Sequence, residues 1–402
     1  DLRAQVAANV TGERRLGDVF TRFGLREVRA DIDALIEYTR RRTGAALARF
    51  PAGTYRAEGS VDNDGFTDRP VRLCAAVTMG DAAIEFDLSG SDPQRRAPVN
   101  STLAQTFSAC AYAAKCLIDD DIPVNQGFYE CIRVHAPLGT VTNCESPAPV
   151  VGGWETQTRL VDVIFRALAP VMGDRAIAGT KAMMCQAGFG GIDPRSGEYY
   201  CVYEALAGGY GARRDKDGPD AVQAHGQNTE NAPIEEIELN YPVRIARYEL
   251  IEDSEGPGRH RGGLGLRRDY LFPDHAASFT VLADRDRAGP WGLWGGLPGR
   301  PAEYWVSRQG TPHKLGSKMT LEVAAGDVVS FRTCGGGGFG APAERDPALV
   351  LDDVRQGKVS VQRACDIYRV VVDPATWTVD AASTARLRSV RDGTRSDDRG
   401  AG

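Results

Sequence analysis

The sequence predicts an α+β fold with mixed, glycine-rich antiparallel sheets, packed helices and a helical N-terminal arm. Three observations predict this fold. Over residues 1–50, apolar side chains recur at spacings of three and four residues, which is typical of amphipathic helices. From about residue 51 the pattern changes to short alternating runs between Gly- and Asp-rich turns, which is typical of strands. Glycine is dense between Gly179 and Gly340, where we expect strands within long loops.

The chain is predicted to have three parts. Residues 1–50 form a helical arm that Gly24 interrupts, and residues 51–386 form the α+β body. Residues 387–402 are polar and charged, and they are predicted to be a disordered tail because they lack the apolar residues of a packed core.

The first elements of the body follow from alternation and capping. Strands are expected at 71–78 and 83–88, where apolar and polar residues alternate. A mostly buried helix is expected at 103–117, because Asn100-Ser-Thr can cap its N-terminus. A second helix is expected from Glu155 to about Leu168, directly after a double glycine.

The second half of the body is predicted with fewer helices. Strands are expected at 198–203 and 278–282, both within long glycine-rich loops. Near the C-terminus, helices are expected at 347–355 and 360–365, and a strand is expected at 368–372.

Composition excludes several classes of protein. A formal net charge of −6 without a long Lys/Arg run argues against a nucleic-acid surface or an anionic-membrane binder. Charged residues break every apolar stretch well before the roughly 18 residues that a membrane span needs. The 9 cysteines include no C-x-x-C pair, which indicates reduced thiols in a cytoplasmic protein. The first residues, Asp1-Leu-Arg, carry neither an initiator Met nor a signal segment, so we expect a split, processed or truncated end.

The strongest chemical pattern lies in the helix after the double glycine. Glu155, Arg159 and Asp162 are spaced so that a helix aligns all three on one face. One interpretation is a solvated stripe of salt bridges. The other is a catalytic or anion-binding group at a helix N-terminus, where the dipole and free N–H groups favour negative charge.

Glycine-rich turns supply the candidates for binding substrate or an intermediate. Gly208, Gly209 and Gly211 lie in the turn GGYGAR, which either presents backbone donors to a ligand or forms a structural β-bulge. Arg261, in RHRGG, either binds a carboxylate or phosphate or ties loops together. Arg285 lies in DRDR beside a Trp- and Gly-rich segment, as in an interface or a pocket wall.

The run TCGGGGFG at 333–340 allows two interpretations, a tight chain crossing or an anion cradle. It lacks the Lys-Ser/Thr ending of an ATP phosphate loop. The 5 histidines are widely spread and match no metal-binding motif, and no G-x-S-x-G nucleophile elbow occurs. We therefore assign no metal ligand to this chain.

Individually these motifs are weakly specific, but their order is specific. The chain contains, in this order, AQVAAN, EFDLSGS, APVNST, IPVNQGFYECIRVHAPLGT, GGWETQTRLVD, GGYGAR, APIEEIE, RYELIEDSEGPGRHRGG, DRDRAGPWGLWGG, GGGGFGAPAERDP and DVRQGKVS. Over about residues 1–373 this succession resembles the hydantoinase B/oxoprolinase family.

The resemblance implies a subunit or half of an ATP-dependent enzyme. Members open cyclic amides such as hydantoin, N-methylhydantoin and 5-oxoproline, or they carboxylate acetone or acetophenone. A hydantoinase A-type partner binds ATP with Mg and phosphorylates the substrate oxygen, and the B-type subunit supplies a cavity and a divalent-metal site. The family's metal ligands lie in a region that precedes the counterpart of DLRAQ. The metal is therefore expected on a missing N-terminal segment or a separate polypeptide.

Three functions remain open on these grounds. The first is a cytoplasmic subunit of a hetero-oligomeric, ATP-dependent cyclic-amide hydrolase that acts on a small molecule. The second is a subunit of an ATP-dependent ketone carboxylase, which needs bicarbonate. The third is a non-catalytic scaffold that has lost the metal segment. The resemblance places the glycine run as a close-packed turn near the assembled site or a subunit contact.

Overall fold

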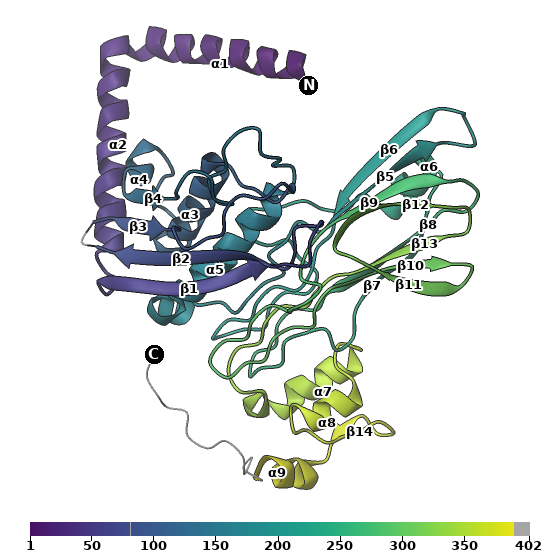
Figure 1. The fold of residues 1–402 in the computed structure, drawn as a ribbon. Coiled ribbons are helices and arrows are strands. Elements are labelled where there is room, and N and C mark those ends of the chain that lie inside the picture. Colours follow the sequence, from purple (N-terminus) through teal and green to yellow (C-terminus); the bar gives the residue numbers. More distant parts are fainter. Residues whose placement is uncertain (81, 390–402) are drawn as a thin grey trace.

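The computed structural model describes residues 1–80 and 82–389, which form two lobes, a bundle of extended segments between them, and a small C-terminal unit (Figure 1). The sheets are mostly antiparallel and are packed with helices, so the predicted α+β class is confirmed. Within these residues, no helix is long and apolar enough to cross a membrane.

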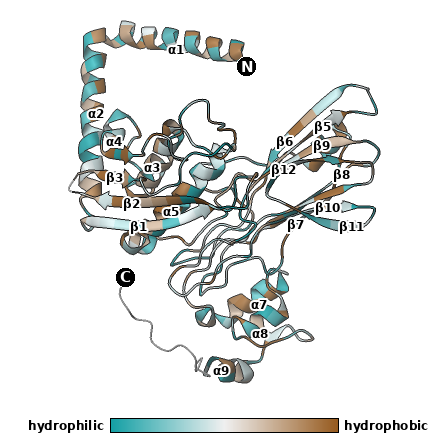
Figure 2. Ribbon diagram, viewed as in Figure 1, coloured by the Kyte–Doolittle hydropathy of each residue, from teal (hydrophilic) through white to brown (hydrophobic). Residues whose placement is uncertain are grey.

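The N-terminal arm consists of α1 (Leu2–Phe23) and α2 (Leu25–Leu47), which meet at Gly24 where φ is 84°. Both helices lie where the apolar spacing predicts them. No residue of α1 is buried, although apolar residues recur along it (Figure 2). The C-terminal end of α2 is buried on the first lobe, where it packs against the short helix α4 (Gln126–Tyr129).

The first lobe is a four-stranded sheet covered by helices. Its strands lie in the order β1 (Gly53–Val61), β2 (Val71–Met79), β3 (Ile84–Asp87) and β4 (Ile132–His135), and only β3 and β4 pair in parallel. The helix α5 (Gly153–Met172) packs on β1, β2 and α3 (Leu103–Leu117). The expected cap of α3 is present, since Thr102 and Gln105 form a reciprocal capping box.

The second lobe contains two antiparallel sheets. One has the order β11 (Thr311–Leu315), β10 (Glu303–Arg308), β13 (Val328–Arg332), β8 (Leu266–Leu271) and β7 (Arg244–Leu250). The other has the order β12 (Lys318–Val323), β9 (Ala277–Leu282), β5 (Gln186–Ile192) and β6 (Tyr199–Ala205), with α6 (Ile234–Asn240) nearby. Aromatic rings join the sheets, since the ring centroid of Phe279 lies 5.8 Å from those of Tyr270 and Phe331.

Between the lobes, glycine-rich segments lie directly on one another (Figure 1). A Cβ atom at Gly335, Gly336 or Gly337 would lie within 2.0 Å of a backbone oxygen of another segment. The N–H groups of Gly335 to Gly338 all donate to carbonyl oxygens at 2.8–3.2 Å. Because these donors are used within the protein, the run is a tight chain crossing, and the anion-cradle interpretation is wrong.

The C-terminal unit contains α7 (Pro347–Arg355), α8 (Val361–Asp366), β14 (Val372–Asp373), β15 (Thr378–Val379) and α9 (Ala381–Ser389). Two short 3-10 helices, η1 (Gly173–Arg175) and η2 (Pro342–Glu344), occur elsewhere.

Two expectations for this unit need correction. The expected strand at 368–372 is wrong except at Val372, because Arg369 has a φ of 57° and the chain cannot stay extended there. Its alternating apolar residues instead fill a small core with α7 and α8. Helix α9 continues to Ser389, so the expected disorder is wrong for 387–389, and the rest of the expected tail, 390–402, lies outside the described residues.

Candidate functional site

The predicted group on α5 is buried, and it faces the second lobe. Glu155, Arg159 and Asp162 are 0%, 3% and 3% exposed, respectively. The interpretation as a solvated stripe is therefore wrong. Their partners come from segments more than 15 residues away in the chain, chiefly the loop after β9.

Arg159 pairs with Asp284, which follows β9. The other oxygen of Asp284, Oδ1, accepts hydrogen bonds from the Lys318 ammonium at 3.0 Å and from the Asp62 backbone N–H at 2.9 Å. Although burial opposes it, the charges of Lys318 and Arg159 hold the pKa of Asp284 below its ordinary value. Burial, together with the Asp284 charge, raises the pKa of Asp62.

Asp162 pairs with Arg285, whose Nη2 donates to Oδ2 at 2.7 Å. The Trp291 indole N–H donates to the same oxygen at 2.9 Å, and the Thr180 backbone N–H donates to Oδ1 at 3.1 Å. Burial opposes ionisation, but Arg285 and His225 hold the pKa of Asp162 well below its ordinary value. The structure therefore brings the predicted residues Arg159, Asp162 and Arg285 into one cluster.

Glu155 differs from Asp162 in its partners, because it accepts hydrogen bonds from backbone N–H groups and forms no ion pair with an arginine among the described residues. Its carboxylate accepts hydrogen bonds from the backbone N–H groups of Met184 and Cys185 at 3.0 and 3.3 Å. Burial raises the pKa of Glu155 to about 7, and burial lowers the pKa of the neighbouring Lys181 to about 8. An acid and an amine that titrate near neutral pH in a dry site are suited to holding or moving a proton.

A cavity of about 190 Å³ opens beside the cluster. Its wall includes Asp62, Arg159, Asp162, Arg285 and Trp291, with Arg166 at the exposed side. The Nε atom of Arg159 is buried without a hydrogen-bond partner among the described residues. Glu155 is not part of this wall, so its proton would reach a ligand only through another group. The cavity offers guanidinium donors and the side chain of Trp291 to a small polar or anionic molecule.

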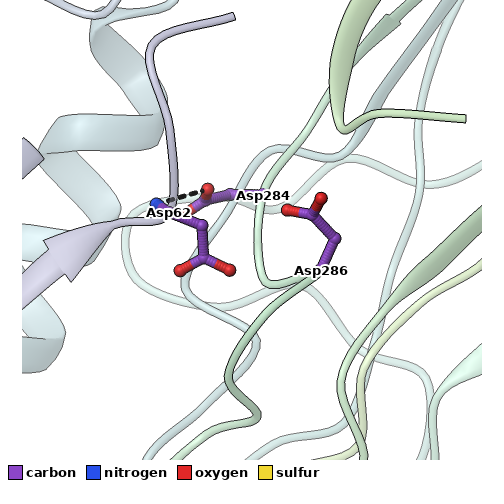
Figure 3. Close-up of side chains that lie close together, drawn as sticks. All are labelled: Asp62, Asp284 and Asp286. Carbon is purple, nitrogen blue, oxygen red and sulfur yellow. Dashed lines mark hydrogen bonds between the residues drawn. The ribbon is translucent and has the colours of Figure 1, made fainter. Parts of the chain in front are cut away.

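Within residues 1–80 and 82–389, one trio of acidic side chains is close enough to share a metal ion: Asp62, Asp284 and Asp286 (Figure 3). One carboxylate oxygen from each residue lies within 4.8 Å of the other two. The donor set does not fit a divalent cation, because the ammonium of Lys318 and the guanidinium of Arg159 already neutralise Asp284. We derive no metal chemistry from this trio.

Arg261 lies outside the cluster. Its Nη1 and Nε atoms donate to Asp220 at 2.8 Å and to Asp353 at 2.9 Å, in a separate buried network. The predicted glycines pack within the bundle. A Cβ atom at Gly209 or Gly211 would lie 2.1 or 1.9 Å from a backbone oxygen, and the N–H groups of Gly208 and Gly209 donate to carbonyl oxygens. A role for these residues in ligand binding stays a prediction.

Sequence reasoning missed Asp62, Lys181 and Lys318. Asp62 belongs to the turn Asp-Asn-Asp-Gly, one of the Asp-rich turns between expected strands, and neither lysine has another charged residue within three positions. Asp284 lies within the DRDR motif beside the predicted Arg285. The density of charge in DRDR is therefore the feature of the sequence that points to Asp284.

Comparison with known proteins gives consistent matches. A family model described as hydantoinase B/oxoprolinase matches residues 1–342. The putative B-type component of a D-/L-hydantoinase from Pseudomonas sp. strain NS671 is 33% identical over an alignment of 405 positions, and the match covers 97% of this chain and 67% of the relative.

Two solved structures have the same fold. The crystal structure of the ATP-dependent caprolactamase of Pseudomonas jessenii matches with a TM-score of 0.87 at 28% identity, covering 96% of this chain and 69% of that chain. A nucleotide-free acetone carboxylase matches with a TM-score of 0.83 at 21% identity, covering 93% of this chain and 57% of that chain. The chain thus spans between just over half and about two thirds of these three proteins.

Proposed function

Since the chain belongs to the hydantoinase B/oxoprolinase family, we propose that it is a subunit of an ATP-dependent cyclic-amide hydrolase. The observation that carries the proposal is the match along at least 96% of the chain to a hydantoinase component and to a caprolactamase. Both names refer to enzymes that act on cyclic amides. The proposed substrates are hydantoin, N-methylhydantoin or 5-oxoproline.

In this proposal an A-type partner binds ATP with Mg and phosphorylates the amide oxygen, which turns a poor leaving group into a good one. The divalent metal of the family would be held by a separate polypeptide or segment. The ionic neutralisation of Asp284 by Lys318 supports placing that metal outside the residues described here. The 9 cysteines are all unpaired, which supports a cytoplasmic location.

The cavity beside α5 is the proposed place of the activated intermediate. The unpartnered Nε of Arg159 and the exposed guanidinium of Arg166 would bind its anionic oxygens. Asp162 would keep Arg285 and Trp291 in position through the hydrogen bonds at 2.7 and 2.9 Å. Glu155 would serve as a buried proton store behind Arg159, because its pKa is raised to about 7 by burial.

The second candidate is a subunit of a ketone carboxylase, since an acetone carboxylase has the same fold, with a TM-score of 0.83. At 21% identity this likeness concerns the fold alone. The third candidate is a non-catalytic scaffold. The buried charges around an open cavity argue against it, since a scaffold gains nothing from burying ion pairs beside a cavity.

The test is phosphate release from ATP by this chain reconstituted with an A-type partner and with the region of a relative that this chain does not match. Cyclic amides are expected to stimulate release only in the full complex. Stimulation by acetone or acetophenone with bicarbonate, and not by cyclic amides, would select the carboxylase. An assembled complex that no substrate stimulates would leave the scaffold.

A further inference from the structure

A second cavity, of about 610 Å³, lies away from the cluster around Asp284. It is formed by α3, by the C-terminal half of α5 with the residues that follow it, and by the segment 210–216. Its volume lies in the range of sites for small organic ligands. None of the residues proposed above for catalysis lines it.

One wall of this cavity is aromatic. The rings of Tyr112, Phe165 and Tyr210 line it, and their centroids lie 6.0, 5.2 and 6.1 Å from the ring of His225 behind them. The side chain of His225 is fully buried, and its Nδ1 has no hydrogen-bond partner among the described residues. Its Nε2 shares a hydrogen bond of 2.9 Å with the hydroxyl of Thr180. The aromatic rings of the lining offer an apolar surface to the body of a small organic ligand.

The cations at this cavity are of two kinds. Lys115 donates to three backbone carbonyl oxygens, and Arg175 donates to two, so both are used to close the ends of neighbouring segments. Arg213 and Lys216 form no ion pair within the part of the chain that the structure describes. Lys216 is exposed and Arg213 is half-buried.

Arg213 lines the cavity together with Tyr210 and Cys116. Burial raises the pKa of Tyr210 and of Cys116, and the charge of Arg213 partly offsets both increases. Both effects agree with the lining, in which Tyr210 and Cys116 come from different segments of the chain. The acidic residues of the lining, Asp120, Asp174 and Asp215, are exposed, and Asp174 pairs with Arg214.

We propose that this cavity binds an organic carboxylate with a flat or aliphatic body. The carboxylate would accept hydrogen bonds from Arg213, and the body would lie against Tyr112, Phe165 and Tyr210. Arg213 is suited to this role because a guanidinium matches a carboxylate in a bidentate geometry. The site goes beyond the proposed function, and its binding requires neither ATP nor a second polypeptide.

The experiment is calorimetric titration of the full chain with hexanoate and benzoate, and with the neutral isosteres hexanamide and benzamide. The carboxylates are expected to bind about tenfold or more tightly than the amides, because only a charged acceptor gains from the guanidinium. Arg213→Gln is expected to weaken carboxylate binding about tenfold or more, and Lys216→Gln to weaken it less. Arg244→Gln, an exposed change on β7 in the other lobe, is the matched control and is expected to bind like the wild type.

Three results would overturn the proposal: no binding of either carboxylate, equal binding of carboxylates and amides, or wild-type binding by Arg213→Gln. Arg166→Gln separates the two cavities. If that variant loses carboxylate binding while Arg213→Gln keeps it, the carboxylate occupies the cavity beside α5 and the assignment made here is wrong. Because ATP turnover does not enter this assay, a failure here leaves the proposed hydrolase function standing.

Discussion

Two buried networks, one around Asp284 and one around Asp353, both pair arginines with aspartates, but their surroundings differ. In the first, Arg159 and Lys318 neutralise Asp284 next to a cavity of about 190 Å³ that also exposes Arg166. In the second, Asp353 accepts hydrogen bonds from Arg261 at 2.9 Å and from Arg345 at 2.7 Å.

The second network joins α7 to the glycine-rich segments. Arg261 also pairs with Asp220, and Arg345 pairs with Asp217, so each guanidinium bridges two carboxylates. The comparison teaches that a buried arginine beside glycines does not identify a site. The Nε atoms of Arg159 and Arg345 are both buried without a hydrogen-bond partner among the described residues, so an unpartnered donor does not identify a site either. A site requires in addition an open cavity.

The largest expected effect comes from breaking the second network. Asp353→Asn removes a charged acceptor from both Arg261 and Arg345, and it is expected to lower the free energy of unfolding by ~3–5 kcal/mol, because each lost hydrogen bond to a charged group contributes ~1.5–3 kcal/mol. Turnover per folded subunit is expected to stay unchanged. Urea denaturation measures the first quantity, and the reconstituted ATPase assay measures the second.

Asp352→Asn is the matched control, because Asp352 is the exposed neighbour on the same helix. It is expected to change stability by less than about 0.5 kcal/mol. If Asp353→Asn were as stable as this control, or if it lost turnover while folded, the division between the two networks would be wrong.

The same comparison shows what the sequence could and could not predict. The helices at 103–117 and 347–355 are found at those positions because their caps and spacing are local. The alignment of Glu155, Arg159 and Asp162 on one face also follows from helix geometry alone. The burial of that face depends on Asp284 and Arg285, more than 120 residues later, and no local pattern carries that pairing.

Arg261 and Arg285 illustrate the limit. Both are arginines in charged, glycine-flanked motifs, and the sequence offers no reason to separate them. Only the tertiary structure shows that Arg261 pairs with Asp220 and Asp353. It also shows that Arg285 pairs with Asp162, beside a cavity. The glycine run was ambiguous for a similar reason, since its hydrogen-bond partners lie in distant segments.

A smaller effect sharpens the contrast through pH. Burial raises the pKa of Glu155 from 4.5 to about 7, so the folded state holds a proton that the unfolded state releases between these values. The stabilising contribution is complete below pH 4.5 and is lost as pH rises through about 7, with a slope of up to ~1.4 kcal/mol per pH unit. Glu155→Gln is expected to remove this slope. Urea denaturation at pH 5, 6, 7 and 8 measures it.

The second network is expected to respond with the opposite sign. Although burial opposes it, Arg345 lowers the pKa of Asp217 and Arg261 lowers that of Asp220, so the contribution of these two carboxylates to stability is lost as pH falls.

Glu145→Gln, an exposed change, is the control for Glu155→Gln and should leave the wild-type slope intact. Parallel stability curves for the wild type and Glu155→Gln would contradict a protonated Glu155 at neutral pH.

The smallest expected effect concerns Arg166, which lies at the cavity mouth and forms no ion pair in the described part of the chain. Arg166→Gln is expected to leave the free energy of unfolding within about 0.5 kcal/mol of the wild type, because the side chain is exposed. Turnover by the reconstituted complex is expected to fall about tenfold, which corresponds to the loss of one charge-assisted hydrogen bond.

Arg56→Gln on β1, also exposed, is the control and is expected to keep wild-type turnover. A loss confined to KM would mean that Arg166 binds substrate and transition state equally, whereas a loss in kcat would mean that it binds charge that develops during the reaction. Equal turnover by the two variants would show that Arg166 is not part of the site. Arg159 would then be the main residue in the cavity that donates hydrogen bonds to an anion.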